Sequence, residues 1–591
     1  MCGIHLIWGK DANPEAIEAM VADSYHRGPD QQDVFSPWPG LWIGVNRLKI
    51  LHPGPDADQP FWAPDGNSLL IWNGEIYNFL ELKKLLSQMG VEFLTESDTE
   101  VLLHYLRFFG LDALKNLEGM FSLIYVNLVD QSVVVARDRT GEKPLYFSQT
   151  PDTFALSSET RGLARLTHAE LEVHQIEPYF YLRSPIPEKT FFRGIRPWKP
   201  GRFSKISQHS TFRWDTLPDP EPPRNPPSQE SFIDSLRQAV LRQFHADVPH
   251  GVMLSGGADS SLLYSLWYKE TGIPLPAYTI EVEKKYRKKY ADATFAKQLV
   301  RQVPAEHQLV EVTQQVFLDR WEDYLQSVDQ PIGDSAGFLT WLIGLKAKNQ
   351  VKVLASGAGA DELWGGYQRH QAFYQYLKYP DLWGRIAPTL ANLPFGRTWK
   401  KFMQGIDSDP RVTFMNFAAL QNPPKELLED YLRIFDTNLS PYKQALDFDR
   451  KVYLVQDVLK VQDNALMAHG IEGRSPYLDS SMISIWRSVE DQKSLLGKPW
   501  IKQGLEDLNL SWISSRRKFG FGLPLPEWLS ENGPFAQRVF SSLREFAPIA
   551  EKEGSTELAD FCKNPEKQVN AHFLTLYNLF LLAEWMKLHR A

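Results

Sequence analysis

Cysteine is scarce in this chain: its 591 residues contain only two, Cys2 and Cys562. So few thiols exclude a disulfide scaffold and a zinc site built from cysteine ligands. A reducing compartment fits this usage, and we expect a cytoplasmic protein. No apolar run of about 18 residues occurs, so no membrane span is predicted. Residues 1–15 hold one short apolar stretch and no basic leader, which is not the pattern of a signal peptide.

Positive charge is also in short supply, because 64 lysines and arginines face 72 acidic residues and leave a net charge of -8. A nucleic-acid surface needs an excess of basic residues, so we expect no nucleic-acid partner. The phosphate loop GxxxxGK[ST] is absent, which excludes nucleotide hydrolases of that type. A chain of this length does not fit one hydrophobic core, so two or more domains are predicted.

The chain is organised around GVMLSGGADSSLLYSLW, residues 251–267. This stretch predicts a short strand, a Ser-Gly-Gly turn and a helix that opens at Ser260. Glycines let backbone N–H groups converge on phosphate oxygens, and the positive end of the helix adds to the field. Asp259 at the turn would repel a bare phosphate, which predicts a bridging cation such as Mg²⁺. Ordinary helix capping explains the serine and the aspartate but not the paired glycines.

The motif SGGADSS, residues 255–261, resembles the pyrophosphate loop of the N-type ATP pyrophosphatases, which cleave ATP to AMP and pyrophosphate. Strand patterns at 277–282 and 307–313 alternate with a helical pattern at 291–303. Such alternation predicts a doubly wound parallel sheet with its ligand at the carboxyl ends of the strands. The resemblance implies that ATP contacts Leu254, Ser255, Gly256, Gly257, Asp259, Ser260 and Ile280, the last of these against the adenine ring.

A second strand and glycine turn follow in VKVLASGAGADELWGGY, residues 351–367. Ser356 and Gly357 are placed to touch the nucleotide. Asp361 supplies a second carboxylate beside Asp259 for Mg²⁺, which takes few protein oxygens. An Asp-Glu pair at a helix start is otherwise a common capping arrangement. Two such loops in one α/β domain favour the metal site.

Cys2 becomes the first residue once an initiator methionine is removed, and its thiol then lies beside its own α-amine. That amine titrates at about 7.7, so it can accept the thiol proton at neutral pH. Alone, such a cysteine is a weak signal for a nucleophile. Six motifs accompany it, in this order: HRGPD (26–30), NRLKI (46–50), NGEIYN (73–78), SDTE (97–100), LEGMFSLIYVN (117–127) and ARDRTGEKPLYF (136–147).

Together with Cys2, these motifs resemble the class II glutamine amidotransferases, which are N-terminal-nucleophile (Ntn) hydrolases, over residues 2 to about 200. The resemblance implies an αββα sandwich in which Cys2 attacks the amide of glutamine. It also implies a glutamine pocket formed by Arg47, Leu48, Lys49, Ile50, Leu51, Asn73, Gly74, Glu75 and Asp98.

Elementary chemistry assigns roles to several of these residues. Asn73 and the N–H of Gly74 suit an oxyanion hole. Arg47 suits the α-carboxylate of glutamine, because a guanidinium donates two parallel hydrogen bonds, and Asp98 with Glu75 suits the α-ammonium. Taken alone, Asn-Gly predicts a type I′ hairpin turn, which can also present donors, and Arg47 and Asp98 would be surface ion-pair partners.

Six prolines in residues 216–229 predict a stiff, extended linker. We therefore predict a glutaminase domain at 1–210, a linker at 211–230 and an ATP pyrophosphatase domain at 231–591. The periodicity predicts strands and helices on either side of this linker: strands at 69–73, 121–127 and 132–138, and helices at 78–90, 98–110 and 231–244.

The C-terminal part is helix-rich, and its segments 462–479 and 515–529 resemble those of the glutamine-hydrolysing asparagine synthetases. Lys518 falls on that family's basic residue for the pyrophosphate-forming transition state, whose developing charge a fixed cation stabilises. A lysine beside two arginines is otherwise a solvated surface cluster. We interpret His469 and Arg474 as structural residues.

One position departs from that family: SGAGADE carries Ala358 where the family has a glutamate implicated in forming the acyl-adenylate. Either another carboxylate substitutes, or the acceptor is not aspartate, or the synthetase half is impaired. We expect an ATP-dependent ligase that hydrolyses glutamine, adenylates a carboxylate and releases glutamate, AMP and pyrophosphate, with L-aspartate as the leading acceptor. A ligase for another carboxylate, a weakened nucleotide- or glutamine-binding homologue, and a homodimer stay open.

Overall fold

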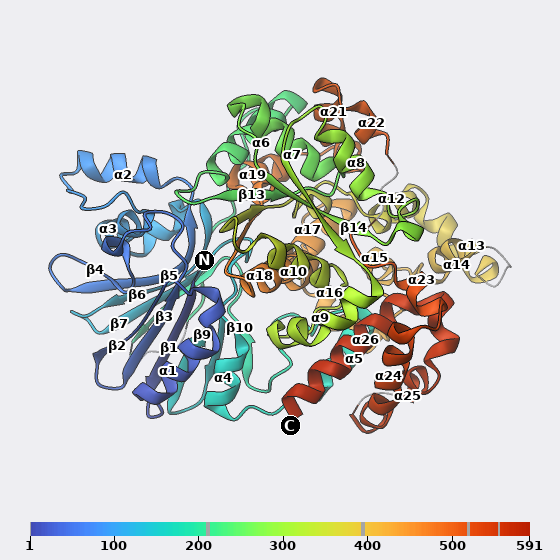
Figure 1. Ribbon diagram of the computed structural model, residues 1–591, viewed down its shortest axis with the longest axis horizontal. Coiled ribbons are helices and arrows are strands. Elements are labelled where there is room, and N and C mark those ends of the chain that lie inside the picture. The colour runs from blue at the N-terminus through green and yellow to red at the C-terminus, as the bar shows by residue number, and fades with distance from the viewer. Residues whose placement is uncertain (1, 208–212, 392–395, 517–519, 554–555, 591) are drawn as a thin grey trace.

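The computed structural model describes residues 2–207, 213–391, 396–516, 520–553 and 556–590. Its N-terminal part contains two stacked antiparallel sheets, seen at the left of Figure 1. The strand order in the first sheet is β10 (Ile195–Pro197), β8 (Tyr146–Gln149), β9 (Thr153–Ser157), β1 (Gly3–Gly9), β3 (Leu41–Arg47) and β2 (Gln31–Trp38). In the second sheet it is β12 (Asp215–Thr216), β11 (Arg202–Ser207), β7 (Ser132–Arg137), β6 (Gly119–Asn127), β5 (Ser68–Ile76) and β4 (Phe61–Trp62).

Helices cover the outer face of each of these sheets. The first sheet is covered by α1 (Pro14–Asp23) and α4 (Thr160–Thr167), and the second by α2 (Phe79–Gln88) and α3 (Asp98–Phe109). Alternation along the strands explains the layers: Ile4 and Leu6 of β1 pack between the sheets, while Ile7 packs in a different apolar cluster with Ile17 of α1. The arrangement is the αββα sandwich that the sequence predicts.

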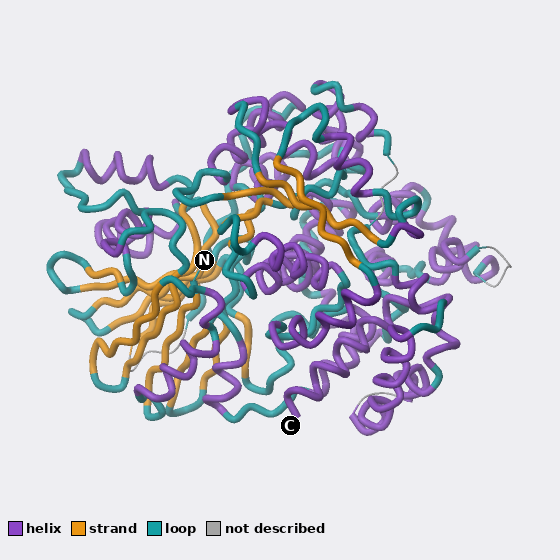
Figure 2. Tube along the Cα trace, viewed as in Figure 1, coloured by secondary structure: helices purple, strands orange, loops and turns teal. Residues whose placement is uncertain are grey.

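The second part is built on a parallel sheet with helices on both faces (Figure 2). Its strand order is β15 (Glu306–Val312), β14 (Pro276–Val282), β13 (His250–Met253), β16 (Val353–Ala355) and β17 (Glu472–Arg474). One face packs against α6 (Gln229–Gln243), α7 (Ala258–Thr271) and α8 (Asp292–Leu299), and the other against α10 (Ala336–Ala347) and α18 (Leu459–Met467). The order reverses between β13 and β16, so the loops that follow these two strands flank a switch point, where ligands bind.

The remainder is largely helical, as the sequence predicts. Its last helix, α26 (Val569–Arg590), packs against α5 (Ile176–Leu182) of the N-terminal part (Figure 1). The other α-helices of the described residues are α9 (Gln314–Ser327), α11 (Ala360–Leu363), α12 (Gln368–Lys378), α13 (Pro380–Leu390), α14 (Arg397–Gln404), α15 (Pro410–Ala418), α16 (Lys425–Leu432), α17 (Pro441–Lys451), α19 (Ser480–Ser488), α20 (Gln492–Leu495), α21 (Pro499–Asp507), α22 (Ser511–Ser514), α23 (Leu525–Ser530), α24 (Pro534–Glu553) and α25 (Thr556–Lys563).

The proline-rich segment lies against both parts. Leu217 is buried in the apolar cluster of the second N-terminal sheet, and Asp219 pairs with Arg450 of α17 at 3.3 Å. Predicted boundaries differ by a few residues: for example, α7 begins at Ala258 rather than Ser260, and α8 ends at Leu299 rather than 303. In the part of the chain that the structure describes, no helix is long and apolar enough to cross a bilayer.

Candidate active sites

Cys2 stands at the start of β1 and is buried beside strand β5. Two hydrogen bonds fix its main chain: its N donates to Asn73 Oδ1 at 2.8 Å, and its O accepts from Arg27 Nε at 3.3 Å. Gln59 Nε2 lies 4.0 Å from Cys2 Sγ. Because the main chain is held on both sides, the position of the sulfur is set by Asn73 and Arg27.

Asn73 and Gly74 lie inside β5, so the hairpin-turn interpretation is wrong. Asn73 is fully buried, and its Nδ2 has no hydrogen-bond partner among the described residues. A buried amide donor without a partner is costly unless a ligand completes it. At Gly74 a Cβ would lie 2.0 Å from the Met120 carbonyl oxygen, so only glycine fits there. The pair thus offers a free side-chain donor next to an unobstructed main chain.

A single pocket gathers most of the residues predicted for glutamine. It is lined by Cys2, Arg47, Leu48, Ile50, Leu51, Gly74, Glu75 and Asp98, and also by Gln59, Trp72, Thr99 and Glu472. Arg47 is oriented by Asp58 and by the His52 carbonyl oxygen at 3.0 Å. Two residues of the predicted set, Lys49 and Asn73, do not line the pocket: Lys49 pairs with the same Asp58 at 2.7 Å, and Asn73 contacts the main chain of Cys2.

The acidic residues that line this pocket come from both parts of the chain: Glu75 and Asp98 from the first and Glu472 from the second. Burial raises the pKa of Asp98 to about 7, although the Ile76 N–H donates to its Oδ2 at 3.2 Å. Burial also raises the pKa of Glu75, which forms an ion pair with Arg474. Burial opposes ionisation of Glu472 as well, but Arg474, at 2.7 Å, brings the pKa of this carboxyl down to about 2.

The first glycine loop connects β13 to α7, as the sequence predicts. Ser255 and Ser260 join across it, with their Oγ atoms 3.1 Å apart, and Gly257 N donates to Ser255 Oγ at 3.2 Å. Gly256 has φ +67°, and a Cβ there would lie 2.6 Å from the main-chain nitrogen of Ala296. The remaining residues predicted for ATP on this side, Leu254 and Ile280, are buried at the end of β13 and within β14.

The second glycine loop meets the first. A Cβ on Gly357 would lie 2.8 Å from the Cβ of Asp259, so the two loops are in contact. Lys498 Nζ lies 2.7 Å from both carboxylate oxygens of Asp259 and 2.8 Å from Asp361 Oδ1. Burial opposes the charge of this lysine, but the two aspartates raise its pKa above the ordinary value. Asp259 and Asp361 therefore face one point that already holds a cation.

Ala358, next to these carboxylates, donates its N–H to Ser356 Oγ at 3.2 Å. The nearest carboxyl along the loop beyond Asp361 is Glu362, which is buried and accepts a hydrogen bond from Tyr367. Burial and then Asp361 raise the pKa of Glu362 to about 7. Lys518 lies outside the described residues.

Several residues at the two sites are absent from the sequence prediction. Gln59, Trp72 and Thr99 line the pocket beside Cys2 without belonging to the predicted set, and Glu472 reaches it from the C-terminal part of the chain. Lys498 is the residue that precedes α21, outside any motif that we identified. Thr99 lies in the SDTE motif and Glu472 in the segment 462–479, but neither was assigned to a site. Nothing in the sequence assigned Gln59, Trp72 or Lys498, because each acquires its place through contacts distant in the chain.

Comparisons with known proteins match two families along the chain. Residues 1–214 match the family described as glutamine amidotransferase domain, and residues 231–587 match asparagine synthase. Asparagine synthetase [glutamine-hydrolyzing] 1 of Bacillus subtilis (strain 168) is 25% identical, over 95% of this chain and 93% of its own length. Asparagine synthetase [glutamine-hydrolyzing] 3 of the same organism is also 25% identical, over 81% of this chain and 79% of its own length.

Among solved structures, the allosteric regulatory enzyme of purine biosynthesis is 17% identical, covering 52% of this chain and 80% of that chain with a TM-score of 0.30. That score is too low to support an argument. The asparagine synthase match, by contrast, spans more than half of the sequence and includes both glycine loops and the α18–β17 segment. This chain is a member of the asparagine synthase family, with a glutamine amidotransferase domain at its N-terminus.

Proposed function

We propose that this protein is an ATP-dependent amidotransferase that takes ammonia from glutamine and places it on an activated carboxylate. The observation that carries the proposal is the pocket in which Cys2 meets Arg47 and Asp98. A thiol, a guanidinium and a carboxylate in one enclosed space match the amide, the α-carboxylate and the α-ammonium of glutamine. The two glycine loops supply a second site, on the synthetase side, for the activation step.

In the first half-reaction, the Cys2 thiolate attacks the amide carbon of glutamine. The oxyanion that forms is stabilised by Asn73 Nδ2 and the Gly74 N–H, the donors described above. Ammonia leaves and a thioester remains, which water hydrolyses to glutamate with release of the thiolate. Removal of Met1 would free the Cys2 amine to carry the proton.

In the second half-reaction, a carboxylate oxygen of the acceptor attacks the α-phosphorus of ATP and pyrophosphate leaves. Ammonia then attacks the acyl carbon of the adenylate, and AMP departs with the former carboxylate oxygen. The loops at 254–260 and 356–357 are proposed to hold the nucleotide, and Lys518 to stabilise the pyrophosphate-forming transition state. Asp259 and Asp361 would hold Mg²⁺ once Lys498 Nζ, which lies between them, has moved aside; bound there, the ion would neutralise phosphate charge.

L-Aspartate is the acceptor that we propose first, giving L-asparagine. Ala358 favours a second candidate, a different carboxylic acid, because no carboxylate stands at this loop position. A catalytically weakened homologue would bind glutamine or ATP without turnover. Screening carboxylic acids for pyrophosphate release from ATP, with ammonium chloride as nitrogen donor, separates the three. Release with aspartate supports the first, release with another acid the second, and none with any acid contradicts a ligase.

Glutamine binding is expected to depend on pH through Asp98. Its carboxyl must be ionised to hold the α-ammonium, and its pKa is raised to about 7. The KM for glutamine should therefore fall about tenfold between pH 6 and pH 8, as the ionised fraction rises. A steady-state KM profile of glutamate release measures this.

Asp98→Asn serves as the control for that profile. The variant should raise KM and remove its pH dependence in this range. The same raised pKa makes the ionised form unfavourable in the fold, so the Asp98 contribution to folding stability falls as pH rises from about 4 to 7. A wild-type KM that stays flat from pH 6 to pH 8 would contradict the assignment of Asp98.

A further inference from the structure

The side chain of Gln59 lies against the sulfur of Cys2 in the wall of the glutamine pocket. Its Nε2 lies 4.0 Å from Cys2 Sγ, which is within hydrogen-bond range for a sulfur acceptor. Gln59 is only 4% exposed, so water does not compete freely for this amide. The thioester chemistry proposed above uses Asn73 and Gly74 for the oxyanion and leaves Gln59 without a role.

The hydrogen bonds of Gln59 decide which end of its amide faces the sulfur. Trp72 N donates to Gln59 Oε1 at 2.7 Å, and only the oxygen end of an amide accepts from an N–H group. The opposite assignment would set two donors against each other, so the NH₂ end must point toward Cys2. Trp72 precedes Asn73 and Gly74 in β5, so one strand fixes this amide and carries both donors proposed for the oxyanion.

A second glutamine fixes the main chain of Gln59. Gln31 of β2 accepts from Gln59 N at 3.3 Å and donates through its Nε2 to the Gln59 carbonyl oxygen at 2.5 Å. The preceding residue, Asp58, pairs with Arg47. Because both the main chain and the side-chain oxygen of Gln59 are held, its NH₂ group is preorganised against the sulfur.

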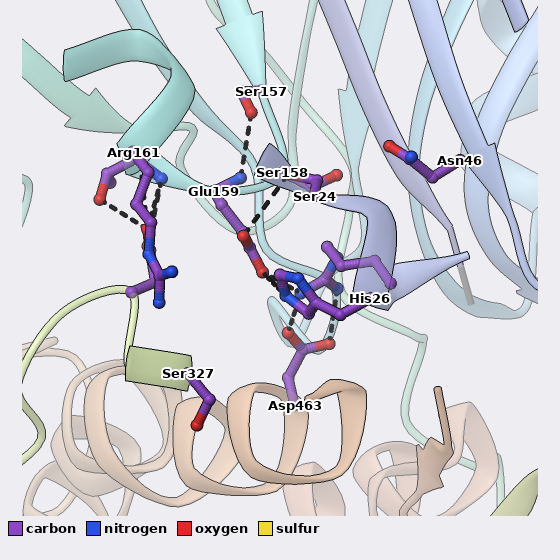
Figure 3. A network of polar contacts seen from close by, with 12 residues as sticks. Ser24, His26, Asn46, Ser157, Ser158, Glu159, Arg161, Ser327 and Asp463 are labelled. Atoms are coloured by element: carbon purple, nitrogen blue, oxygen red, sulfur yellow. Dashed lines mark hydrogen bonds and ion pairs between the residues drawn. The ribbon is translucent and has the colours of Figure 1, made fainter. Parts of the chain in front are cut away.

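The main chain of Cys2 does not depend on Gln59. Its carbonyl oxygen accepts from Arg27 Nε at 3.3 Å. Arg27 is fixed in turn by Glu159 and Asp463, whose side chains point toward one another in Figure 3. Removing the Gln59 amide should therefore change the surroundings of the sulfur and leave the Cys2 main chain in place.

We propose that Gln59 is a catalytic residue of the glutaminase half-reaction, whose amide N–H donates to the Cys2 thiolate and stabilises that charged form. This inference rests on the proposed function. A hydrogen bond to the charged form favours transfer of the thiol proton to the Cys2 α-amine, and the thiolate then attacks the amide carbon of glutamine. When water hydrolyses the thioester, the C–S bond breaks and its electron pair returns to the sulfur, where the same donor stabilises it.

The pH dependence of Cys2 alkylation measures this contact without any substrate. Iodoacetamide reacts with thiolates, and peptide mass spectrometry separates Cys2 from Cys562. Gln59→Met keeps the length of the side chain but removes the donor, so the midpoint of the alkylation profile should rise by about one pH unit. Gln59→Glu keeps an acceptor for Trp72 and places a negative oxygen near the sulfur, so its midpoint should rise at least as far. This second variant carries the test if Gln59→Met does not fold.

Glutamate release separates a chemical role of Gln59 from a structural one. At pH 7 the kcat of Gln59→Met should fall about tenfold, while the KM for glutamine changes by less than about threefold. The loss should shrink as pH rises, because base then supplies the thiolate that the amide no longer stabilises. A merely structural defect would persist at every pH. Gln32→Ala, which removes a neighbouring amide bonded to the Gly28 carbonyl oxygen, should leave both profiles unchanged.

The outcomes separate the inference from the function beneath it. Alkylation midpoints within about 0.3 pH units of the wild type in both Gln59 variants overturn the inference and leave the function untouched. A shifted midpoint with an unchanged kcat at pH 7 also overturns the catalytic role. Wild-type protein that releases no glutamate, while the midpoints still shift, contradicts the function, whereas the hydrogen bond from Gln59 to the Cys2 thiolate stands.

Discussion

Replacing Cys2 with alanine should reduce glutamate release from glutamine by at least about a thousandfold. The expected loss is this large because the reaction passes through a thioester, and the other cysteine, Cys562, lies in α25 of the C-terminal helices. Amide formation from ammonium chloride should persist, since the sulfur belongs to the glutamine pocket rather than to either glycine loop. Parallel assays of glutamate release and of ammonia-dependent pyrophosphate release measure the two half-reactions separately.

Cys562→Ala is the matched control for that experiment. Cys562 is buried, and burial raises the pKa of its thiol to about 12, so it is not a thiolate at neutral pH. The control should retain glutamine use, apart from a modest loss of stability from the missing sulfur. The nucleophile assignment would be wrong if the Cys2→Ala chain still released glutamate at a rate near that of the wild type.

Replacing Arg474 with methionine should destabilise the protein by about 3–5 kcal/mol. The guanidinium is fully buried and forms ion pairs with Glu75 and Glu472. It also donates hydrogen bonds to two main-chain oxygens, those of Gln243 at 2.7 Å and His245 at 2.6 Å. Without it, two buried carboxylates lose the cation that compensates their desolvation. Against a typical folding free energy of about 5–15 kcal/mol, such a loss is large. Urea denaturation followed by tryptophan fluorescence measures it.

The triple variant Arg474→Met, Glu75→Gln, Glu472→Gln separates charge from packing. Neutralising the two carboxylates removes the uncompensated charge, so much of the lost stability should return even though the ion pairs are gone. Glutamine binding should be weaker in the triple variant than in the wild type, because Glu75 lines the pocket and loses its charge. A single Arg474→Met variant that loses less than about 1 kcal/mol would contradict the role assigned to this arginine.

The fold was predictable where periodicity is local and strong. The pattern at 121–127 predicted most of β6 (Gly119–Asn127), and the pattern at 98–110 matches α3 (Asp98–Phe109) closely. The fifth strand of the parallel sheet, β17, was not predicted, because three residues carry no periodicity and their pairing with β16 is set by tertiary contact. The proline-rich segment was predicted to be a stiff, extended linker, and its contact between Asp219 and the buried Arg450 was not predicted.

Site residues were predictable where they lie in recognisable sequence motifs. Cys2, Arg47, Asp98, Asp259 and Asp361 were all named from short patterns, and the structure brings them together in two groups. Lys498 was missed because its partners lie 239 and 137 residues away in the sequence. Glu472 lies in the segment 462–479 that resembles the family, but its role was missed because it enters the pocket beside Cys2 from a strand of the other part. Residues placed by long-range packing leave no local signal.

The transfer of a carboxylate oxygen to AMP tests the account most directly. The acid that supports pyrophosphate release in the acceptor screen is labelled with ¹⁸O in its carboxylate. The enzyme is then incubated with this acid, with ATP and with glutamine that carries ¹⁵N in its amide. We predict one ¹⁸O atom in AMP and the ¹⁵N atom in the product amide, as seen by mass spectrometry. Unlabelled AMP, or ADP in its place, would contradict activation by adenylation, and an amide without ¹⁵N would contradict glutamine as the source of its nitrogen.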